Sequence, residues 1–150
     1  EDDKNWYEEQ KNFASDTIKM VYTGDGRVVW VGKDVTGIEP RNASVIEVPD
    51  ITANRRITVP GYWFYRDDKF VFDYKLKAED ERDALLQQAS IMTSEWEKDL
   101  LLGLISDEDR EKLKAYRIYA KSLQAMDFSI ITDKTSYNAI EWPVSPEASS

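Results

Sequence analysis

Residues 62–76 read Tyr62-Trp63-Phe64-Tyr65-Arg66-Asp67-Asp68-Lys69-Phe70-Val71-Phe72-Asp73-Tyr74-Lys75-Leu76, and this stretch decides the fold. Two runs of aromatic and β-branched residues, 62–65 and 70–74, flank the polar turn 66–69. Such runs on either side of a short polar turn predict a β-hairpin. Strand character stops near Leu76, so the stretch also marks the place where strands give way to helices.

The chain is therefore predicted to have an α+β fold in two parts. Residues 1–76 form a β-rich domain, an antiparallel meander of hairpins, and residues 77–150 form an antiparallel α-helical hairpin with an extended tail. Both faces of the 62–74 hairpin carry aromatic rings, more than one buried face of an antiparallel sheet requires. Two interpretations stay open: a sheet packed on both sides, one of them by the helices, or an exposed aromatic surface that binds a partner or a sugar.

Upstream of this stretch the pattern also indicates strands. Residues 17–22 are β-rich, and residues 27–31 follow as a return strand after Gly24-Asp25-Gly26. Glycines supply the positive φ angles that a tight hairpin turn needs. A further short strand, 44–48, is closed by Pro49, which lacks the N–H that a ladder requires.

Downstream of it, apolar residues recur at helical spacing. Apolar residues between 85 and 100 form a first set, which predicts one buried stripe on a helix over 78–103. Apolar residues between 113 and 123 form a second set, which predicts another helix after the N-cap Ser106. Gly103 fits a helix C-cap. A helix of roughly 39 Å exceeds the width of a domain this small, so we expect the hairpin to project or to pack on another copy. The two sets are Leu85, Ala89, Met92, Trp96, Leu100, and Leu113, Tyr116, Ala120, Leu123.

Composition excludes several classes of function. The 150 residues include 20 Lys and Arg, 29 Asp and Glu, no His and no Cys, with a formal net charge of −9. Without Cys and His there is no thiol nucleophile, Ser-His-Asp triad, iron–sulfur ligand or disulfide, and no zinc site of the usual kind. We expect no metal, no cofactor, no catalytic residue and no apolar membrane span. An acidic chain also argues against binding to nucleic acid.

A glycosidase pair such as Glu95 with Asp99 is better explained as surface charge, because the acid of such a pair needs an apolar pocket.

An ordered set of motifs resembles the tail fibre assembly proteins of tailed bacteriophages, in their Mu-like branch. The resemblance covers most of the chain. The first residue is not Met, which predicts a processed, tagged or truncated product, and the resemblance implies a missing segment before Trp6. The motifs are Asn5-Trp6-Tyr7-Glu8-Glu9, Asp16-Thr17-Ile18-Lys19, residues 45–56, Gly103-Leu104 with Ser106-Asp107-Glu108-Asp109, residues 113–119, and Glu141-Trp142-Pro143-Val144-Ser145-Pro146.

The resemblance implies a chaperone that binds the distal, C-terminal part of a trimeric tail fibre and assists its folding and trimerisation. It implies work in the host cytoplasm during assembly, as a homo-oligomer or a fibre-bound multimer. Some family members stay at the fibre tip and influence receptor choice. The alternative is a carbohydrate-binding tip adhesin, whose rings Tyr62, Trp63 and Tyr65 would stack on host lipopolysaccharide.

Candidate partner-binding residues are aromatic side chains of the strand-rich part and one arginine of a small basic island. Trp30 and Trp63 are equally compatible with a place in the core, because large aromatic rings dominate cores. Trp96 and Trp142 are assigned to the core, with Trp142 holding the final segment on the helices. The candidates are Trp6, Tyr7, Phe13, Trp30, Arg56 and Trp63.

Overall fold

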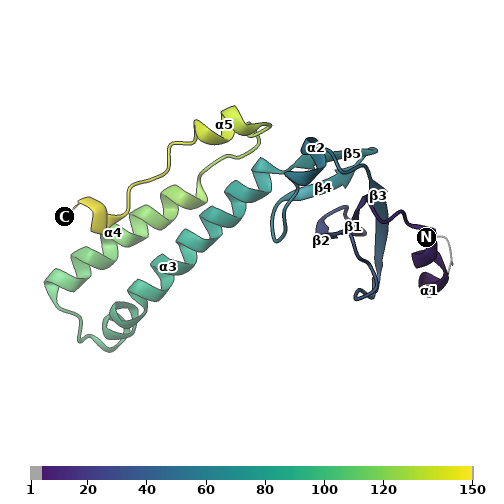
Figure 1. The fold of residues 1–150 in the computed structure, drawn as a ribbon. Coiled ribbons are helices and arrows are strands. Elements are labelled where there is room, and N and C mark those ends of the chain that lie inside the picture. Colours follow the sequence, from purple (N-terminus) through teal and green to yellow (C-terminus); the bar gives the residue numbers. More distant parts are fainter. Residues whose placement is uncertain (1–4, 150) are drawn as a thin grey trace. The chain divides into compact units, whose positions relative to one another are not determined.

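The structure, a computed structural model, describes residues 5–149, so the expectations about the start of the chain concern residues outside this range. The chain divides into two compact units, with the boundary between Asp73 and Tyr74 (Figure 1). The α+β class expected from the sequence is confirmed. The first unit holds α1 (Trp6–Glu9), η1 (Gln10–Asn12), β1 (Ile18–Thr23), β2 (Val28–Gly32), β3 (Ala43–Val48), α2 (Thr52–Arg55), β4 (Trp63–Arg66) and β5 (Lys69–Phe72); the second holds α3 (Tyr74–Leu102), α4 (Asp107–Gln124), α5 (Lys134–Asn138) and η2 (Pro146–Ser149).

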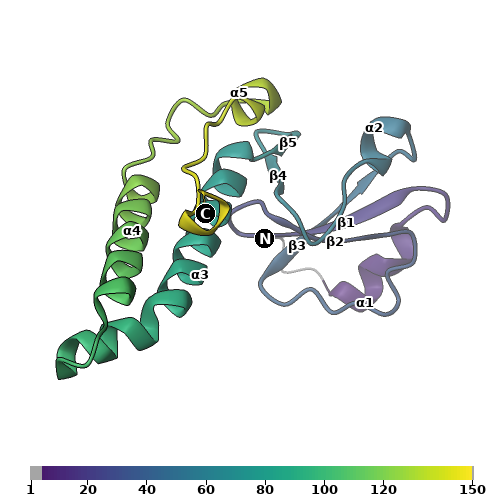
Figure 2. The ribbon, with the colours of Figure 1, turned by 90° about the vertical axis from the view of Figure 1, so that its left-hand side faces the viewer.

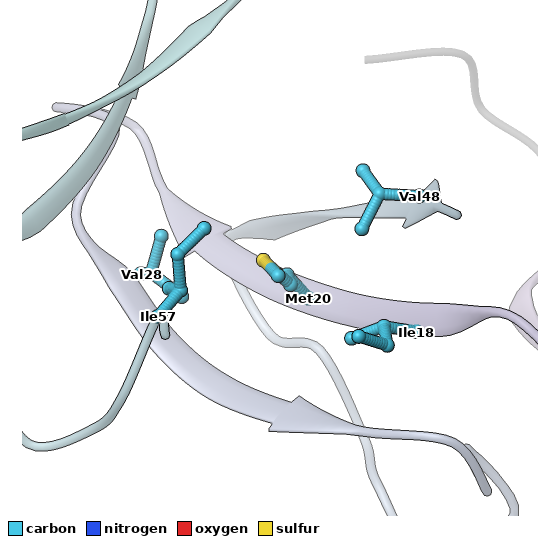
Figure 3. Packing of buried hydrophobic residues seen from close by; sticks show 5 residues of the cluster. All are labelled: Ile18, Met20, Val28, Val48 and Ile57. Atoms are coloured by element: carbon cyan, nitrogen blue, oxygen red, sulfur yellow. The ribbon is translucent and has the colours of Figure 1, made fainter. Parts of the chain in front are cut away.

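The first unit is built on a three-stranded antiparallel sheet with β1 in the middle, in the order β2-β1-β3. Alternate residues of a strand face opposite sides, so Ile18 and Met20 point into one core. Figure 3 shows Val28, Val48 and Ile57 gathered around them. This cluster is the hydrophobic core of the first unit.

The opposite face of β1 buries a lysine. Lys19 is almost fully enclosed, and its Nζ donates hydrogen bonds to the carbonyl oxygens of Ala14 and Thr17. Glu47, its cross-strand neighbour on β3, accepts hydrogen bonds from Ala14 N–H at 2.7 Å and from Thr17 Oγ1 at 2.6 Å. A buried charge is tolerated only when it is hydrogen-bonded in this way. The polar pair therefore fastens the N-terminal arm to the sheet.

The aromatic stretch folds as the expected hairpin of β4 and β5. Asp67 and Asp68 form its tip with φ angles of +51° and +59°. Two consecutive positive φ angles define a type I′ turn, whose twist suits a two-residue hairpin. One face of the hairpin, with Trp63 and Phe70, packs on the core of the three-stranded sheet. Phe64 on the other face is buried beneath the guanidinium group of Arg66, 4.0 Å from the ring centre.

The start of the first long helix differs from the sequence prediction. Strand β5 ends at Phe72 and α3 begins at Tyr74, whereas the sequence predicted a strand through Tyr74 and a helix from residue 78. Tyr74 and Ala78 are four residues apart and pack on one apolar cluster. Tyr74 follows the last strand residue and also lies one helical turn before Ala78, so its side chain suits either element. Its packing on the cluster around Ala78 favours the helix, which explains why α3 begins earlier than predicted.

In the second unit α3 and α4 lie antiparallel, joined by a capped turn (Figure 1). Gly103 has a φ of +71°, its N–H donates to the Leu100 carbonyl, and Leu104 N–H donates to the Asp99 carbonyl at 2.8 Å. These two bonds are the Schellman motif that closes a helix. Ser106 Oγ then accepts from Asp109 N–H at 3.1 Å, as an N-cap does. Both capping residues expected from the sequence are confirmed.

The predicted stripe on α3 is buried only in part. Ala89 lies in the core with Tyr116, Tyr119 and Leu123 of α4, and Trp96 packs against this cluster. Met92 and Leu100, which the spacing also assigned to the buried stripe, are each 44% exposed. The surface that α4 covers does not include the whole stripe, so Met92 in its middle and Leu100 at its end remain partly in solvent. This finding corrects the sequence interpretation.

The chain after α4 returns along the helix pair. Figures 1 and 2 both show it passing from α5 back beside α3 and α4 to η2. Trp142 packs on both apolar clusters of this unit, with its ring 5.9 Å from that of Phe128. Tyr137 OH donates to Glu81 of α3 at 2.6 Å. The final segment is thus held on the helices, as expected for Trp142. None of the described helices has the length and apolar character required to cross a bilayer.

Candidate partner-binding surface

The N-terminal arm brings three of the candidate residues together. Asn5 caps α1 by accepting from Tyr7 N–H, and Trp6 Nε1 donates to the Ile38 carbonyl at 2.9 Å. The rings of Trp6 and Phe13 lie 6.1 Å apart and are both half-buried. Tyr7 is 68% exposed. Trp6 therefore anchors the arm, while the adjacent Tyr7 presents its ring to solvent.

A second pair of candidates meets beside the hairpin. The guanidinium of Arg56 lies 5.4 Å from the centre of the Trp63 ring, a cation–π contact. Trp63 also meets Phe72 edge-on at 5.4 Å and packs on the core. It therefore has a core role, and the outward part of its surface lies under Arg56.

The small basic island formed by Asn54, Arg55 and Arg56 is already partly neutralised. Arg55 Nε lies 2.7 Å from Asp50, and Lys33 Nζ lies 2.6 Å from the same carboxylate. The hydrogen bond from Arg55, followed by that from Lys33, lowers the pKa of Asp50 below its ordinary value. An external anion would have to compete with Asp50 for both cations. Arg56 is thus better placed as an aromatic-stacked contact residue than as half of an anion clamp.

Trp30, the remaining candidate, lies on strand β2. It lies in the middle of β2 opposite Val21, half-buried, with its ring folded over Gly32. A Cβ at Gly32 would lie 2.6 Å from that ring. The glycine therefore makes room for the indole, and Trp30 covers the edge of the sheet with part of its ring facing outward.

The rings proposed for sugar stacking, Tyr62, Trp63 and Tyr65, are engaged with neighbouring aromatic rings. Tyr65 lies between Tyr22 and Phe70, with ring centres 5.1 and 5.0 Å away, and Tyr62 lies 6.0 Å from Phe72. Stacking on a sugar needs one open ring face. This arrangement favours a packed aromatic cluster over a sugar platform.

Glu95, one of the two acids considered for catalysis, is also engaged elsewhere. Glu95 is exposed and pairs with Lys98 at 2.8 Å. A general acid needs an apolar pocket, and the Glu95 side chain is exposed to solvent.

Sequence reasoning missed an apolar surface at the end of the helical hairpin. Leu101, Leu102 and Leu104 are 86%, 71% and 72% exposed. A signal was present, because three consecutive leucines at 100–102 cannot all face one side of a helix with 3.6 residues per turn.

The described residues thus present exposed aromatic and apolar side chains, Tyr7 in the first unit and the leucines at 101, 102 and 104 in the second. A family model described as Caudovirales tail fibre assembly protein, lambda gpK, matches residues 8–147, and the chain belongs to this family. It is 42% identical to tail fiber assembly protein U' of Escherichia phage Mu and 40% identical to that of Escherichia phage P1. It is 35% identical to tail fiber assembly protein U of phage Mu. Each match covers 98% of this chain and 82% of the relative. Family membership supports a role in tail fibre assembly.

Proposed function

We propose that this chain is a chaperone that binds the distal, C-terminal part of a phage tail fibre and assists its folding and trimerisation. The observation that carries the proposal is the family match across both units, with curated relatives that are tail fiber assembly proteins. The strand-rich unit would make the fibre contact, through the outward-facing Tyr7 and the partly exposed surfaces of Trp6, Phe13, Trp30, Trp63 and Arg56.

The physical need for such a helper follows from the topology of a β-rich trimer. Strand pairing between distant parts of a chain, or between chains, forms slowly because loop-closure entropy is lost before the contacts form. Until the trimer closes, strand edges and apolar surfaces are exposed and aggregate. A protein that covers these surfaces needs contact faces and no reactive group. The aromatic residues of the first unit fit that requirement.

Co-expression tests the proposal. The distal region of the cognate fibre, produced alone, should be insoluble or monomeric, and with this chain it should become a soluble trimer. Light scattering after size-exclusion chromatography gives the ratio of chain to fibre, and it separates a homo-oligomer from a multimer formed on the fibre. Equal fibre solubility with and without the chain would overturn the proposal.

The place of action is a separate part of the proposal. Assembly would take place in the host cytoplasm, and the chain would stay at the fibre tip, where it could influence receptor choice. Immunoblotting of purified virions tests retention. Virions free of the chain would limit its role to assembly.

A further inference from the structure

The end of the helical hairpin carries an apolar surface that its own fold does not explain. This surface, the leucine tip, consists of Leu100, Leu101, Leu102 and Leu104, and three of the four are more than two-thirds exposed. Single exposed leucines are ordinary in a folded protein, whereas a contiguous apolar patch marks a contact site. Four leucines within five residues form such a patch.

Local structure requires none of these side chains. The Schellman turn needs the positive φ of Gly103 and two backbone hydrogen bonds. Its usual apolar contact would bury Leu104, yet this side chain is 72% exposed. Helix propensity would be satisfied as well by Ala, Gln or Lys at positions 101 and 102. Stability of the hairpin is therefore no reason for leucine here.

The leucine tip continues into a groove. Met92, Trp96 and Leu100 follow one another on a single stripe of α3, and Met92 and Trp96 line a groove between α3, α4 and the C-terminal segment. Tyr116 and Ala115 of α4 contribute to its floor. An apolar strip thus runs from this groove to the tip, along the stripe that α4 leaves partly uncovered.

Charge indicates what would cover the strip. Residues 95–112 contain seven carboxylates and three basic side chains. Two of the bases are already paired, Lys98 with Glu95 and Lys112 with Glu108. Three carboxylates and one base line the groove, namely Glu108, Glu111, Glu147 and Lys112. An apolar segment flanked by Lys or Arg would match this surface in both its apolar character and its charge.

A second copy of the chain fits less well. Two leucine tips placed together would bring their acidic flanks into contact. The basic residues Arg55 and Lys33 of the first unit already share Asp50. Repulsion between the acidic flanks therefore disfavours a pair of leucine tips, and Asp50 competes for Arg55 and Lys33.

We propose that the leucine tip is a second docking site for the tail fibre polypeptide, receiving an apolar segment flanked by basic residues. This inference rests on the proposed function and adds a contact in the helical unit to those of the strand-rich unit. Two contacts on one chaperone would hold one fibre segment more tightly than either contact alone, because the second binding event is intramolecular.

Photocrosslinking on the full chain, co-expressed with the distal fibre region, tests the site. The photocrosslinker p-benzoylphenylalanine replaces Leu101, and in the control it replaces Ile118, an exposed apolar residue of α4. We expect a light-dependent adduct with the fibre from position 101 and none from position 118. Mass spectrometry should place the adduct in an apolar segment with neighbouring Lys or Arg. An adduct with a second copy of the chain instead would overturn the inference in favour of self-association.

Affinity measurements with the same pair of proteins complete the test. Leu101→Gln with Leu102→Gln keeps helix propensity and should weaken fibre binding about tenfold or more, while Ile118→Gln should leave it unchanged. Binding should weaken with added salt, and Glu111→Gln, at the edge of the groove, should reduce that dependence. Circular dichroism confirms that each variant folds. Equal binding by the wild type and the leucine variant would overturn the inference and leave the proposed function standing. No binding by the wild type would overturn both.

Discussion

The carbonyl oxygen of Gly26 accepts a hydrogen bond from Tyr65 N–H at 2.7 Å, and a Cβ on Gly26 would lie 2.4 Å from the Tyr65 carbonyl oxygen. The β1–β2 turn and strand β4 thus touch backbone to backbone at this point. Gly26 also has a φ of +90°, which residues with a side chain rarely adopt. Gly26 therefore permits the close approach of the aromatic hairpin to the three-stranded sheet.

Gly26→Ala should destabilise the first unit by about 2–4 kcal/mol, from the strained backbone and from the collision with β4, neither of which a flexible side chain can relieve. Gly24→Ala is the matched control two residues away, because a Cβ there meets nothing within 4 Å. Urea unfolding followed by tryptophan fluorescence measures both. Equal unfolding midpoints for the two variants would contradict the close approach of the backbones.

Trp96→Ala should lower the free energy of unfolding of the second unit by about 2–4 kcal/mol. The Trp96 ring lies 5.9 Å from that of Tyr116 and packs on the core shared by α3 and α4, and truncation leaves a cavity there. Leu101→Ala on the same helix, with its side chain 86% exposed, should change stability by less than about 0.5 kcal/mol. Thermal unfolding followed by circular dichroism compares them. A loss below about 1 kcal/mol for Trp96→Ala would show that the helical phase is wrong.

The helical half shows what periodicity can and cannot predict. Spacing correctly identifies Leu113, Tyr116 and Leu123 as the buried side of α4, since one turn of helix brings residues three and four apart onto one face. The same argument places Met92 and Leu100 beside Trp96, and they do share its stripe. It says nothing of whether another element covers that stripe. Burial is a tertiary property, and here α4 and the final segment leave Met92 and Leu100 partly in solvent.

The candidate surface shows a similar limit in the strand-rich half. The turn at Gly26 and the polar tip of the β4–β5 hairpin can be predicted from sequence because both depend on local backbone angles. The contact of Arg56 with Trp63 depends on how the loop after α2 passes β4, which no local pattern encodes. The enclosure of Lys19 is likewise invisible in sequence, because it requires the N-terminal arm to fold back on β1.

Asp133 should titrate below the ordinary range of an aspartate. Its carboxylate accepts hydrogen bonds from the backbone N–H and the hydroxyl of Ser136, and the backbone bond is the main cause of its lowered pKa. A pKa lower in the folded than in the unfolded chain means that this cap stabilises α5 above the unfolded pKa near 3.8 and is lost as pH falls through the folded pKa. NMR titration of the carboxyl carbon measures the pKa directly.

Asp133→Asn removes the negative charge of the capping side chain and keeps an oxygen that can accept the capping hydrogen bond. The amide oxygen can still accept from Ser136 N–H, so α5 should remain folded near neutral pH, while its acid response below about pH 4 should weaken. Hydrogen exchange of the α5 amides reports this locally, apart from the other acidic caps. The explanation would fail if Asp133 titrated at or above 3.8, or if the variant and the wild type lost α5 protection in parallel as pH falls.

Tyr7→Ala should weaken fibre binding about tenfold without changing the unfolding midpoint. The Tyr7 ring is 68% exposed, so its loss removes contact area and leaves the fold intact, and aromatic residues account for much of the energy at binding interfaces. Ile51→Ala, which shortens another exposed apolar side chain of the same unit, is the control and should bind normally. Titration of the purified chain into the distal fibre region, followed by calorimetry, gives both affinities. Equal binding by Tyr7→Ala and the wild type would remove the N-terminal arm from the contact surface. The fibre contacts of this unit would then have to come from the sheet and the aromatic hairpin.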